Sequence, residues 1–330
     1  MQLLRKLALP FSLLYALVVY IRNRCYDKGW FSSRTFETPV VCVGNLSVGG
    51  TGKTPMTEWL IRQLSDTYKI AVLSRGYKRK TKGFRIVKAE DSAVDTGDEP
   101  LQIARKFPNV TVAVEANRVV GIQELEKKYA PELIILDDGF QHRKVVPQYS
   151  ILLTAYGNLY ADDWYLPTGN LRDHRREVSR ADVIVVTKCP ADLGEAEQSH
   201  IIARLKPRRG QKVLFAALRY DKVLQGTDRT LDLSELTQKP FTLVSGIADP
   251  GPLLDYLHGL SLDFDHLSFP DHHSFNREEI ARLRKCDLIV TTEKDYVRLR
   301  GDLKNIYYLP ISHDFLGSDD SRLLRDLKAL

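Results

Sequence analysis

The segment that most restricts the fold of this chain is Cys42–Leu64, with the sequence CVGNLSVGGTGKTPMTEWLIRQL. An apolar run ends at Asn45, a glycine-rich loop follows, and the pattern predicts a helix from Pro55 to about Thr67. Pro55 is compatible with the first helical turn, because the N–H that proline lacks has no partner within a helix there. Strand, glycine loop and helix in this order indicate an α/β fold.

The rest of the chain repeats this alternation of apolar runs and helical patterns. Short Val/Ile/Leu-rich runs with helices between them predict a mostly parallel sheet flanked by helices, as in phosphate-loop NTPases. In such a sheet, ligands bind at the carboxyl ends of the strands. The predicted strands of this first unit are Thr38–Asn45, Lys69–Tyr77, Asn109–Arg118, Glu132–His142, Ser150–Gly157 and Ala181–Pro190.

The residues after the sixth run predict a second, smaller α/β unit. The segment Arg204–Lys212 combines proline, glycine and charge, and we take it as the linker. Three strand-like runs follow, at 212–220, 241–250 and 287–296. The predicted division is therefore residues 1–35 as an N-terminal basic apolar helix, 36–205 as a phosphate-loop core and 206–330 as a smaller domain. The last helix, 319–330, could pack back on the core.

The N-terminus has an apolar run, Leu7–Ile21, flanked by arginines. Residues 1–36 contain six Lys or Arg and one acid, Asp27. A bilayer-spanning helix needs roughly 20 apolar residues, so this run is short. We expect a helix that lies on a membrane surface, with its basic residues at the headgroups. A helix packed into the core is the alternative; a signal peptide is disfavoured, because no small-residue cleavage site follows.

Charge and cysteine content exclude few classes of protein. The net charge of +6 and the pI near 9.0 fit nucleic acid, an anionic membrane or a phosphorylated substrate. The basic residues are dispersed, and the local run Tyr77–Arg85 is typical of a solvated loop, so we expect no nucleic-acid partner. The four cysteines are scattered without metal-ligand spacing, which indicates reduced thiols in the cytoplasm.

The glycine loop departs at one position from the general phosphate-loop pattern G-x-x-x-x-G-K-[ST]: Ser47 replaces the first glycine. The glycines that remain permit a nest of backbone N–H groups at a helix N-terminus, which suits a triphosphate. Lys53 is placed to reach the β- and γ-phosphates, and Thr54 to ligate Mg²⁺. The alternative is a simple glycine-rich turn. The predicted ATP-binding residues are Asn45, Ser47, Val48, Gly49, Gly50, Thr51, Gly52, Lys53 and Thr54.

Two further patterns refine the nucleotide site. A guanine-reading motif would place an aspartate after Thr187-Lys188, but the chain has Pro190 there, which favours ATP over GTP. Asp137 and Asp138 end a predicted buried strand, where phosphate-loop enzymes carry an acid that organises Mg²⁺. A turn-forming Asp-Asp-Gly is the other interpretation.

An enzyme that transfers the phosphate of its bound nucleotide to a hydroxyl also needs a group that accepts the proton of that hydroxyl. The segment TGDEP offers Asp98 and Glu99, and FPDHHSF offers Asp271, His272 and His273. An aspartate and a histidine from two domains would act together only when the domains close.

The ordered set GNLSVGGTGKTP, SRGY, GDEP, NR, LDDGFQH, LPTGNLRD, VTKCP, FPDHHSF and TEKD resembles the tetraacyldisaccharide 4'-kinase family of lipid A biosynthesis. The resemblance covers almost the whole chain and accounts for Ser47, because this family's loop does not keep the first glycine. It implies ATP- and Mg²⁺-dependent phosphorylation of the 4'-hydroxyl of tetraacyldisaccharide 1-phosphate, giving lipid IVA. It also implies peripheral association with the cytoplasmic face of the bacterial inner membrane.

The resemblance also implies roles for individual residues. Asp98 is the expected base, coupled to His272, and Lys53 and Thr54 have the loop roles. Asp137 and Asp138 correspond to the family's paired aspartates near Mg²⁺. The expected substrate or phosphate contacts are Arg75, Arg118, His142 and Asp173, the last at a position where many members have glutamate.

Two other classes of protein remain open from the residues alone. A phosphate-loop ATPase that serves as a metallochaperone or assembly factor would share the loop and the Asp-Asp-Gly. It would be recognised by ATP hydrolysis without a lipid acceptor. A nucleic-acid-binding protein would be recognised by strong binding at physiological salt.

Overall fold

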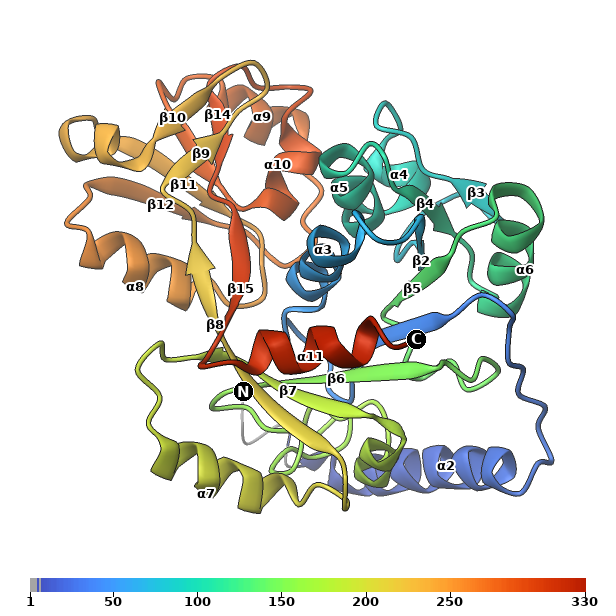
Figure 1. Cartoon of the computed structure of the whole chain (residues 1–330). Helices are drawn as coiled ribbons and strands as arrows, with labels where there is room; N and C mark the ends of the chain where they lie inside the picture. Colours follow the sequence, from blue (N-terminus) through green and yellow to red (C-terminus); the bar gives the residue numbers. More distant parts are fainter. Residues whose placement is uncertain (1–4, 6) are drawn as a thin grey trace.

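The computed structural model describes residue 5 and residues 7–330, and within them the strands form two sheets. Figure 1 shows two lobes, with the larger sheet running through the lower and right-hand parts of the molecule. This sheet has nine strands and is parallel except for its two edge pairs. Its order is β15 (Ile311–Phe315), β8 (Lys212–Tyr220), β7 (Val183–Cys189), β6 (Tyr149–Ala155), β1 (Val40–Asn45), β5 (Leu133–Asp137), β2 (Ile70–Ser74), β4 (Thr111–Val114), β3 (Arg85–Ile86).

Helices cover both faces of the nine-stranded sheet. Alternate residues of β1 belong to different apolar cores, with Val41 and Val43 on one face and Val40 and Cys42 on the other. The first core includes side chains of α3 (Lys53–Leu64), α5 (Asp98–Lys106) and α11 (Asp319–Leu327), and the second those of α6 (Arg118–Tyr129) and α7 (Glu195–Leu205). A sheet buried on both faces explains the unbroken Val/Ile/Leu runs and confirms the predicted α/β class.

The upper-left lobe of Figure 1 is a smaller α/β unit built on a six-stranded sheet. Its strand order is β10 (Thr230–Asp232), β9 (Val223–Gln225), β14 (Ile306–Tyr308), β13 (Ile289–Thr291), β11 (Phe241–Ser245), β12 (Phe264–Ser268). Its helices are α8 (Gly251–Gly259), α9 (Arg277–Leu283) and α10 (Glu293–Leu299), and α4 (Ala93–Thr96) precedes α5 in the larger unit. Short 3-10 helices occur at Arg175–Arg180 and Leu233–Gln238.

The antiparallel pair of β8 and β15 connects the two lobes. The chain leaves the nine-stranded sheet after β8 and returns to it with β15. The expected linker, Arg204–Lys212, joins α7 to β8, and both of these elements pack in the larger unit. Helix α11 contributes Leu323 and Leu327 to the core of that unit. The division at residues 35 and 205 stays a prediction.

One expected strand is partly helical. The run 287–296 forms β13 only as far as Thr291, and α10 begins at Glu293. The side chain of Thr292 accepts a hydrogen bond from the backbone N–H of Asp295, which caps the helix. The local capping interaction therefore overrides the strand-like composition.

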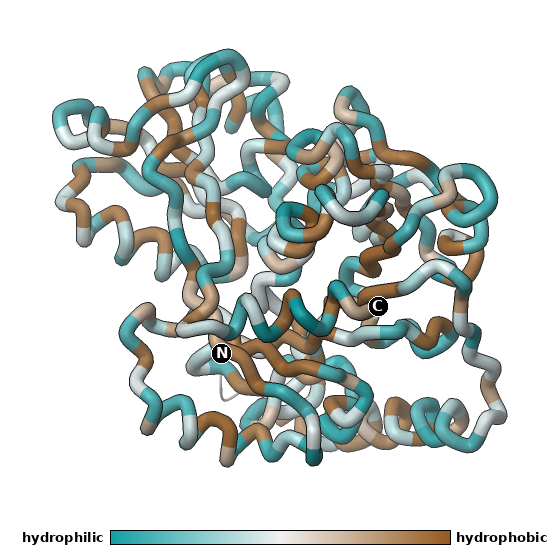
Figure 2. Tube along the Cα trace, viewed as in Figure 1, coloured by the Kyte–Doolittle hydropathy of each residue, from teal (hydrophilic) through white to brown (hydrophobic). Residues whose placement is uncertain are grey.

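Helix α2 (Leu9–Asp27) lies along the base of the molecule in Figure 1, and Figure 2 shows apolar residues along it. The side chains of Ser12, Val19 and Asn23 are buried against the protein. The exposed apolar side chains of α2 are Leu9, Phe11, Leu13, Leu14, Leu17, Val18, Tyr20 and Ile21. Residues 1–4 and 6 of the predicted N-terminal segment lie outside the described residues. None of the helices described here combines the length and apolarity that crossing a bilayer requires.

Candidate active site

The glycine loop joins the central strand β1 to α3 at the carboxyl edge of the sheet. Gly49 and Gly52 have φ angles of 112° and 85°, in the region that glycine adopts without a steric penalty. Gly52 is the N-cap of α3, so the loop delivers its backbone N–H groups to the positive end of the helix dipole. Lys53 and Thr54 are the first two residues of the helix. This backbone arrangement suits a chain of phosphate groups.

Three side chains hold the loop, one each from β1, β7 and β15. Asn45 Nδ2 donates to Thr51 Oγ1 at 2.8 Å, and Thr187 Oγ1 at the end of β7 donates to the Thr51 carbonyl at 2.9 Å. His313 Nε2 of β15 lies 2.9 Å from the Gly52 carbonyl oxygen. Burial lowers the pKa of His313, so the imidazole is neutral and donates from Nε2. Contacts from the protein itself therefore hold the loop in this conformation.

The position of Ser47 explains why glycine is dispensable there. Ser47 bridges to Leu171 of the LPTGNLRD segment, and the next residue, Val48, donates its N–H to the Asn170 carbonyl at 2.7 Å. This part of the loop is extended and paired with another segment, so it does not need the angles that only glycine permits.

Asp138 forms an ion-pair cluster beside Lys53. Arg172 contacts Asp138 through both terminal nitrogens, with Nη1 at 3.0 Å from Oδ2, and also contacts Asn45 Oδ1. Lys53 Nζ is 3.8 Å from Asp138 Oδ1. Burial alone would raise the pKa of Asp138, but Lys53 and Arg172 lower it to about 2. Asp138 thus carries a negative charge that orients Lys53 and Arg172 near the loop.

Asp137 has a different environment from its neighbour. Its side chain is buried at the end of β5, and Thr57 Oγ1 lies 3.4 Å from Oδ1. Burial, followed by the charges of Glu99 and Asp138, raises its pKa to about 7. Its Oδ2 is buried without a hydrogen-bond partner among the described residues. A buried carboxylate oxygen that lacks a donor is in the state expected of a ligand for a hard cation.

These residues fit Mg²⁺ bound together with a nucleotide. Of the predicted metal ligands, Asp137 is at the end of β5, Asp138 follows it, and Thr54 is the second residue of α3. Within residue 5 and residues 7–330, no group of three His, Cys, Asp or Glu side chains forms a metal site. Mg²⁺ commonly uses one or two protein carboxylates and takes its other ligands from phosphates and water, so this small donor set is sufficient.

The structure brings Asp98 and His272 together from the two lobes. Asp98 is the first residue of α5, and Gly97 before it has a φ of 93°. His272 Nδ1 is 3.1 Å from Asp98 Oδ2, and Arg298 contacts the same oxygen. Burial would raise the pKa of Asp98, but the donors on His272 and Arg298 lower it to about 2. His273 instead contacts Glu279 at 2.9 Å, so His272 is the partner of Asp98.

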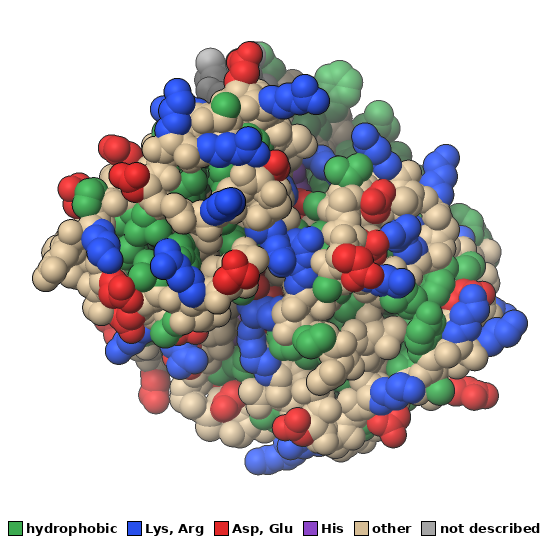
Figure 3. Space-filling model, turned by 90° about the horizontal axis from the view of Figure 1, so that it is seen from above, with side chains coloured by type: hydrophobic (Ala, Val, Ile, Leu, Met, Phe, Trp, Pro, Cys, Tyr) green, Lys and Arg blue, Asp and Glu red, His purple; other side chains and the backbone are tan. Residues whose placement is uncertain are grey.

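The Asp98–His272 pair and the phosphate loop belong to one region. Glu99, next to Asp98, contributes to the raised pKa of Asp137. A pocket lined by Arg105, Lys106 and Arg300 among others lies between the C-terminal half of α5 and α10. Figure 3 shows Lys and Arg side chains gathered along the hollow between the two lobes. This surface has the charge that an anionic substrate requires.

The predicted phosphate contacts differ in their accessibility. Arg75 is exposed one residue beyond β2. Arg118 is 3% exposed, and its Nη1 donates to the Glu115 carbonyl at 2.8 Å. Burial lowers the pKa of Arg118 to about 10, so the guanidinium stays charged at neutral pH. Burial and the charge of Arg118 lower the pKa of His142 to about 4. His142 is therefore neutral and offers a hydrogen bond rather than a charge.

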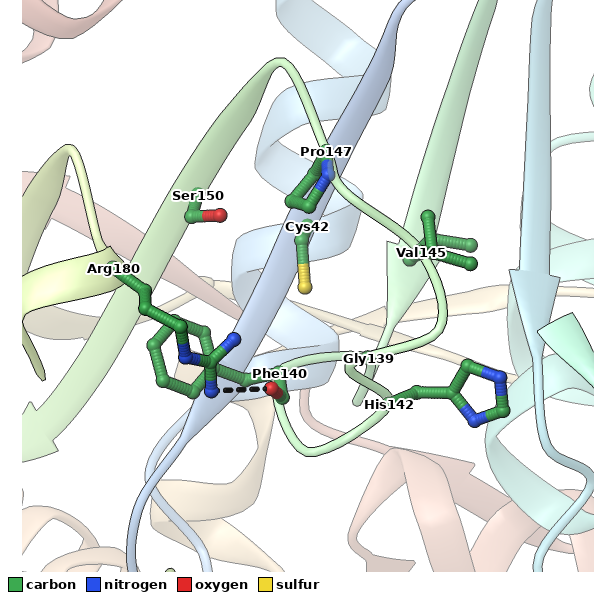
Figure 4. A pocket seen from close by; sticks show the side chains of 9 residues that line it. Cys42, Gly139, Phe140, His142, Val145, Pro147, Ser150 and Arg180 are labelled. Carbon is green, nitrogen blue, oxygen red and sulfur yellow. Dashed lines mark hydrogen bonds between the residues drawn. The ribbon is translucent and has the colours of Figure 1, made fainter. Parts of the chain in front are cut away.

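Asp173 lies between α2 and the core. Its side chain is fully buried; Oδ1 accepts from Asn23 Nδ2 at 2.7 Å, and Arg22 of the same helix is 3.5 Å from Oδ2. Arg180 connects this junction to the Asp-Asp-Gly loop. Its Nη2 is 4.0 Å from Asp173 Oδ2, and its guanidinium lies over the Phe140 ring and donates to the Phe140 carbonyl at 2.8 Å (Figure 4). The Asp173 contacts are those of a residue that anchors α2.

Sequence reasoning gave no role to several residues that the structure places at the site. Arg172 and Lys294 lie inside the motifs LPTGNLRD and TEKD, so these motifs could have indicated that the two residues belong to the site. Arg298 follows Lys294 by one helical turn, which becomes informative only once α10 is known to be a helix. His313 has no motif around it, and only the pairing of β15 with β8 brings it to the loop.

Comparison with known proteins gives a consistent result. The chain matches the family described as tetraacyldisaccharide-1-P 4'-kinase over residues 4–329. The tetraacyldisaccharide 4'-kinase of Flavobacterium johnsoniae is 48% identical over 322 residues, covering 96% of this chain and 94% of that protein. The enzyme of the same name from Bacteroides thetaiotaomicron is 42% identical, covering 95% and 90%. The crystal structure of LpxK from Aquifex aeolicus in complex with ATP is 33% identical, with a TM-score of 0.79 over 98% of both chains.

Proposed function

The chain belongs to the tetraacyldisaccharide-1-P 4'-kinase family, and from this membership we propose which of its residues perform the reaction. The protein is an ATP-dependent kinase that phosphorylates the 4'-hydroxyl of tetraacyldisaccharide 1-phosphate, giving lipid IVA in lipid A biosynthesis. Its substrate is a lipid disaccharide and its cofactors are ATP and Mg²⁺. The assignment of individual residues rests on the geometry described above.

The phosphate loop binds the triphosphate of ATP. Its backbone N–H groups and Lys53 contact the phosphates, and Asp138 with Arg172 keeps Lys53 in place. Asp137 and Thr54 would hold Mg²⁺, which offsets the negative charge on the transferred phosphoryl group. Arg75, Arg118 and His142 are at the same edge and are proposed contacts for phosphate or sugar groups.

Asp98 is the proposed base, and its contact with His272 is the observation that carries this assignment. Both donors that reach Asp98 contact Oδ2, so Oδ1 is available to the acceptor hydroxyl. The 4'-oxygen bonds to the γ-phosphorus, the bond between that phosphorus and the bridging oxygen of ADP breaks, and the hydroxyl proton passes to Asp98 Oδ1. A carboxylate of low pKa is adequate, because a loose phosphoryl-transfer transition state needs little proton transfer before attack.

Helix α2 is the proposed membrane contact. Leu13, Leu14, Leu17 and Val18 are each more than half exposed, while the opposite face of the helix packs on the protein. Arg24 and the exposed Trp30 lie at its end, as expected for a helix at the headgroup level. Tyr15 of the same helix donates to the Arg172 carbonyl at 3.0 Å, which ties α2 to the protein. An enzyme seated this way on the cytoplasmic face of the inner membrane would reach the headgroup while the acyl chains stay in the bilayer.

The experiment that tests the base is phosphate transfer from radiolabelled ATP to tetraacyldisaccharide 1-phosphate in detergent. We expect Asp98→Asn to lower kcat by about 10²- to 10⁴-fold, the usual contribution of a general base, with little change in ATP affinity. Asp265→Asn removes an exposed carboxylate from the smaller lobe and should leave kcat unchanged. Normal turnover of Asp98→Asn would exclude Asp98 as the base.

A further inference from the structure

Helix α10 presents two cations to the Asp98–His272 pair. Lys294 and Arg298 are four residues apart and therefore lie on the same face of the helix. Lys294 Nζ is 3.0 Å from His272 Nε2, and Arg298 contacts Asp98 Oδ2. His272 is thus in contact with a lysine at one ring nitrogen and with a carboxylate at the other.

The contact with Lys294 fixes which ring nitrogen of His272 carries the proton. An ammonium group has donors only, so Nε2 must accept and must be unprotonated. The single proton of the neutral imidazole is then on Nδ1, where it is donated to Asp98 Oδ2 at 3.1 Å. With the other tautomer, an unprotonated Nδ1 would face the carboxylate as a second acceptor, and its donor would be Arg298 Nη2 at 3.3 Å, which already makes its shorter contact with Asp98 Oδ2.

Lys294 is itself held in position. Its ammonium is 3.2 Å from Asp271 Oδ1 and 4.0 Å from Glu99 Oε1, and its side chain is 20% exposed. The helix is fixed by Asp295, which is fully buried, accepts from the Gly246 N–H at 2.8 Å and pairs with Arg298 at 3.1 Å. The cationic face of α10 is therefore a rigid support rather than a set of mobile surface side chains.

We propose that Lys294 is a positioning residue for the transfer reaction: its ammonium selects the His272 tautomer that donates from Nδ1 to Asp98. That donation holds Oδ2, which leaves Oδ1 to receive the proton of the acceptor hydroxyl. The proposal rests on the proposed role of Asp98 as the base. It assigns a chemical task to the lysine of the TEKD motif.

Loss of the ammonium has a specific expected effect. In Lys294→Met, Nε2 no longer faces a donor, and the proton is free to reside there. Nδ1 would then accept from Arg298 Nη2, which already lies 3.3 Å away. His272 would no longer donate a hydrogen bond to Asp98, and the carboxylate would lose one of the two contacts that orient it.

The first readout is spectroscopic. Long-range ¹H–¹⁵N spectra of histidine-labelled protein distinguish the two neutral tautomers, and His272→Gln identifies the signal. We expect the Nδ1–H form in the wild type and in Lys294→Arg, which keeps a donor, and the Nε2–H form in Lys294→Met. Lys304→Met, which removes an exposed lysine from the same lobe, should leave the spectrum unchanged.

The second readout is kinetic. We expect Lys294→Met to lower kcat by about tenfold to a hundredfold, with an ATP KM within about twofold of the wild type. The groups in contact with His272 are Asp98 from α5, Asp271 from its own loop, Lys294 and Arg298 from α10, and the ring of Tyr77.

The possible outcomes separate this inference from the assignment of the base. An unchanged Nδ1–H tautomer in Lys294→Met, or a wild-type kcat for that variant, would overturn the role of Lys294. Full activity of Asp98→Asn would instead overturn the role of Asp98, whatever tautomer His272 has.

Discussion

At the scale of single residues, Gly52 is the position at which the phosphate loop has the least freedom. Its φ of 85° disfavours any L side chain, and a Cβ there would lie 2.8 Å from His313 Cε1. The imidazole is buried and donates to the Gly52 carbonyl, so it has no space to retreat. Backbone conformation and side-chain packing therefore both require glycine at this position.

Gly52→Ala should weaken ATP binding by at least about tenfold, because left-handed backbone costs alanine about 1–2 kcal/mol and overpacking adds to that cost. Calorimetric titration with ATP measures the effect. Gly210→Ala is the matched control, since Gly210 has a φ of 84° but nothing within 4 Å of its Cβ position. If His313 is the obstacle, the Gly52→Ala defect should be partly relieved by His313→Ala; two additive losses would contradict this account.

The residues of the loop could be predicted from sequence because they act through a local pattern. Lys53, Thr54 and the glycines are contiguous, and their spacing alone defines a strand, a nest and a helix N-terminus. His313 and Arg172 reach the loop from more than a hundred residues away in the chain. No local pattern encodes such contacts, so only the order of strands in the sheet reveals them.

At the scale of secondary structure elements, one buried ion cluster ties α3, α5 and α10 together across the two lobes. Lys106 of α5 is 2.7 Å from Glu58 Oε2 of α3 and 2.8 Å from Glu293 Oε1 of α10. Burial and the charge of Glu58 raise the pKa of Glu293 from 4.5 to about 7. Glu293 shares the Lys106 ammonium with Glu58, which also pairs with Arg62 at 3.0 Å, so the ionised form of Glu293 is poorly compensated.

The raised pKa makes stability depend on pH in a defined direction. The folded protein holds the Glu293 proton more tightly than the unfolded chain, so protonation of Glu293 adds to the free energy of unfolding. This added stability is complete below pH 4.5 and is lost as pH rises through about 7. It amounts to roughly 1–3 kcal/mol. The difference in free energy of unfolding between wild type and Glu293→Gln, measured with urea, should therefore change between about pH 5 and about pH 8. Glu278→Gln removes an exposed acid from α9 as the control; a constant difference would contradict the raised pKa.

The elements themselves were predictable where one signal dominated. Long apolar runs identified β1, β5, β6 and β7, because strands buried on both faces need continuous apolar residues. Helix α10 was missed, because a cap at Thr292 decided the structure of a short run whose composition suits a strand. The return of β15 to the larger sheet was also unexpected, since strand pairing depends on contacts far apart in sequence.

At the scale of the whole molecule, the exposed apolar face of α2 and the nucleotide site are joined by one segment. Residues 166–173 contact α2 through Thr168, which accepts from Ser12 Oγ at 2.8 Å, and through Asp173. The same segment contacts the nucleotide site through Arg172. The helix is therefore fixed relative to the loop, and a membrane bound to α2 would hold the site at a constant height above the lipid headgroups.

This arrangement predicts that α2 matters for a substrate in a bilayer and not for a substrate in detergent. Leu14→Glu and Leu17→Glu, at side chains that are 60% and 53% exposed, should each reduce sedimentation with anionic vesicles by about fivefold or more. Turnover of bilayer-embedded substrate should fall with it, while turnover in detergent stays at the wild-type rate, because neither side chain reaches the nucleotide site. Leu260→Glu adds the same charge at an exposed apolar position of the smaller lobe and should have no effect. Vesicle binding that is unchanged in both α2 variants would place the membrane contact elsewhere on the molecule.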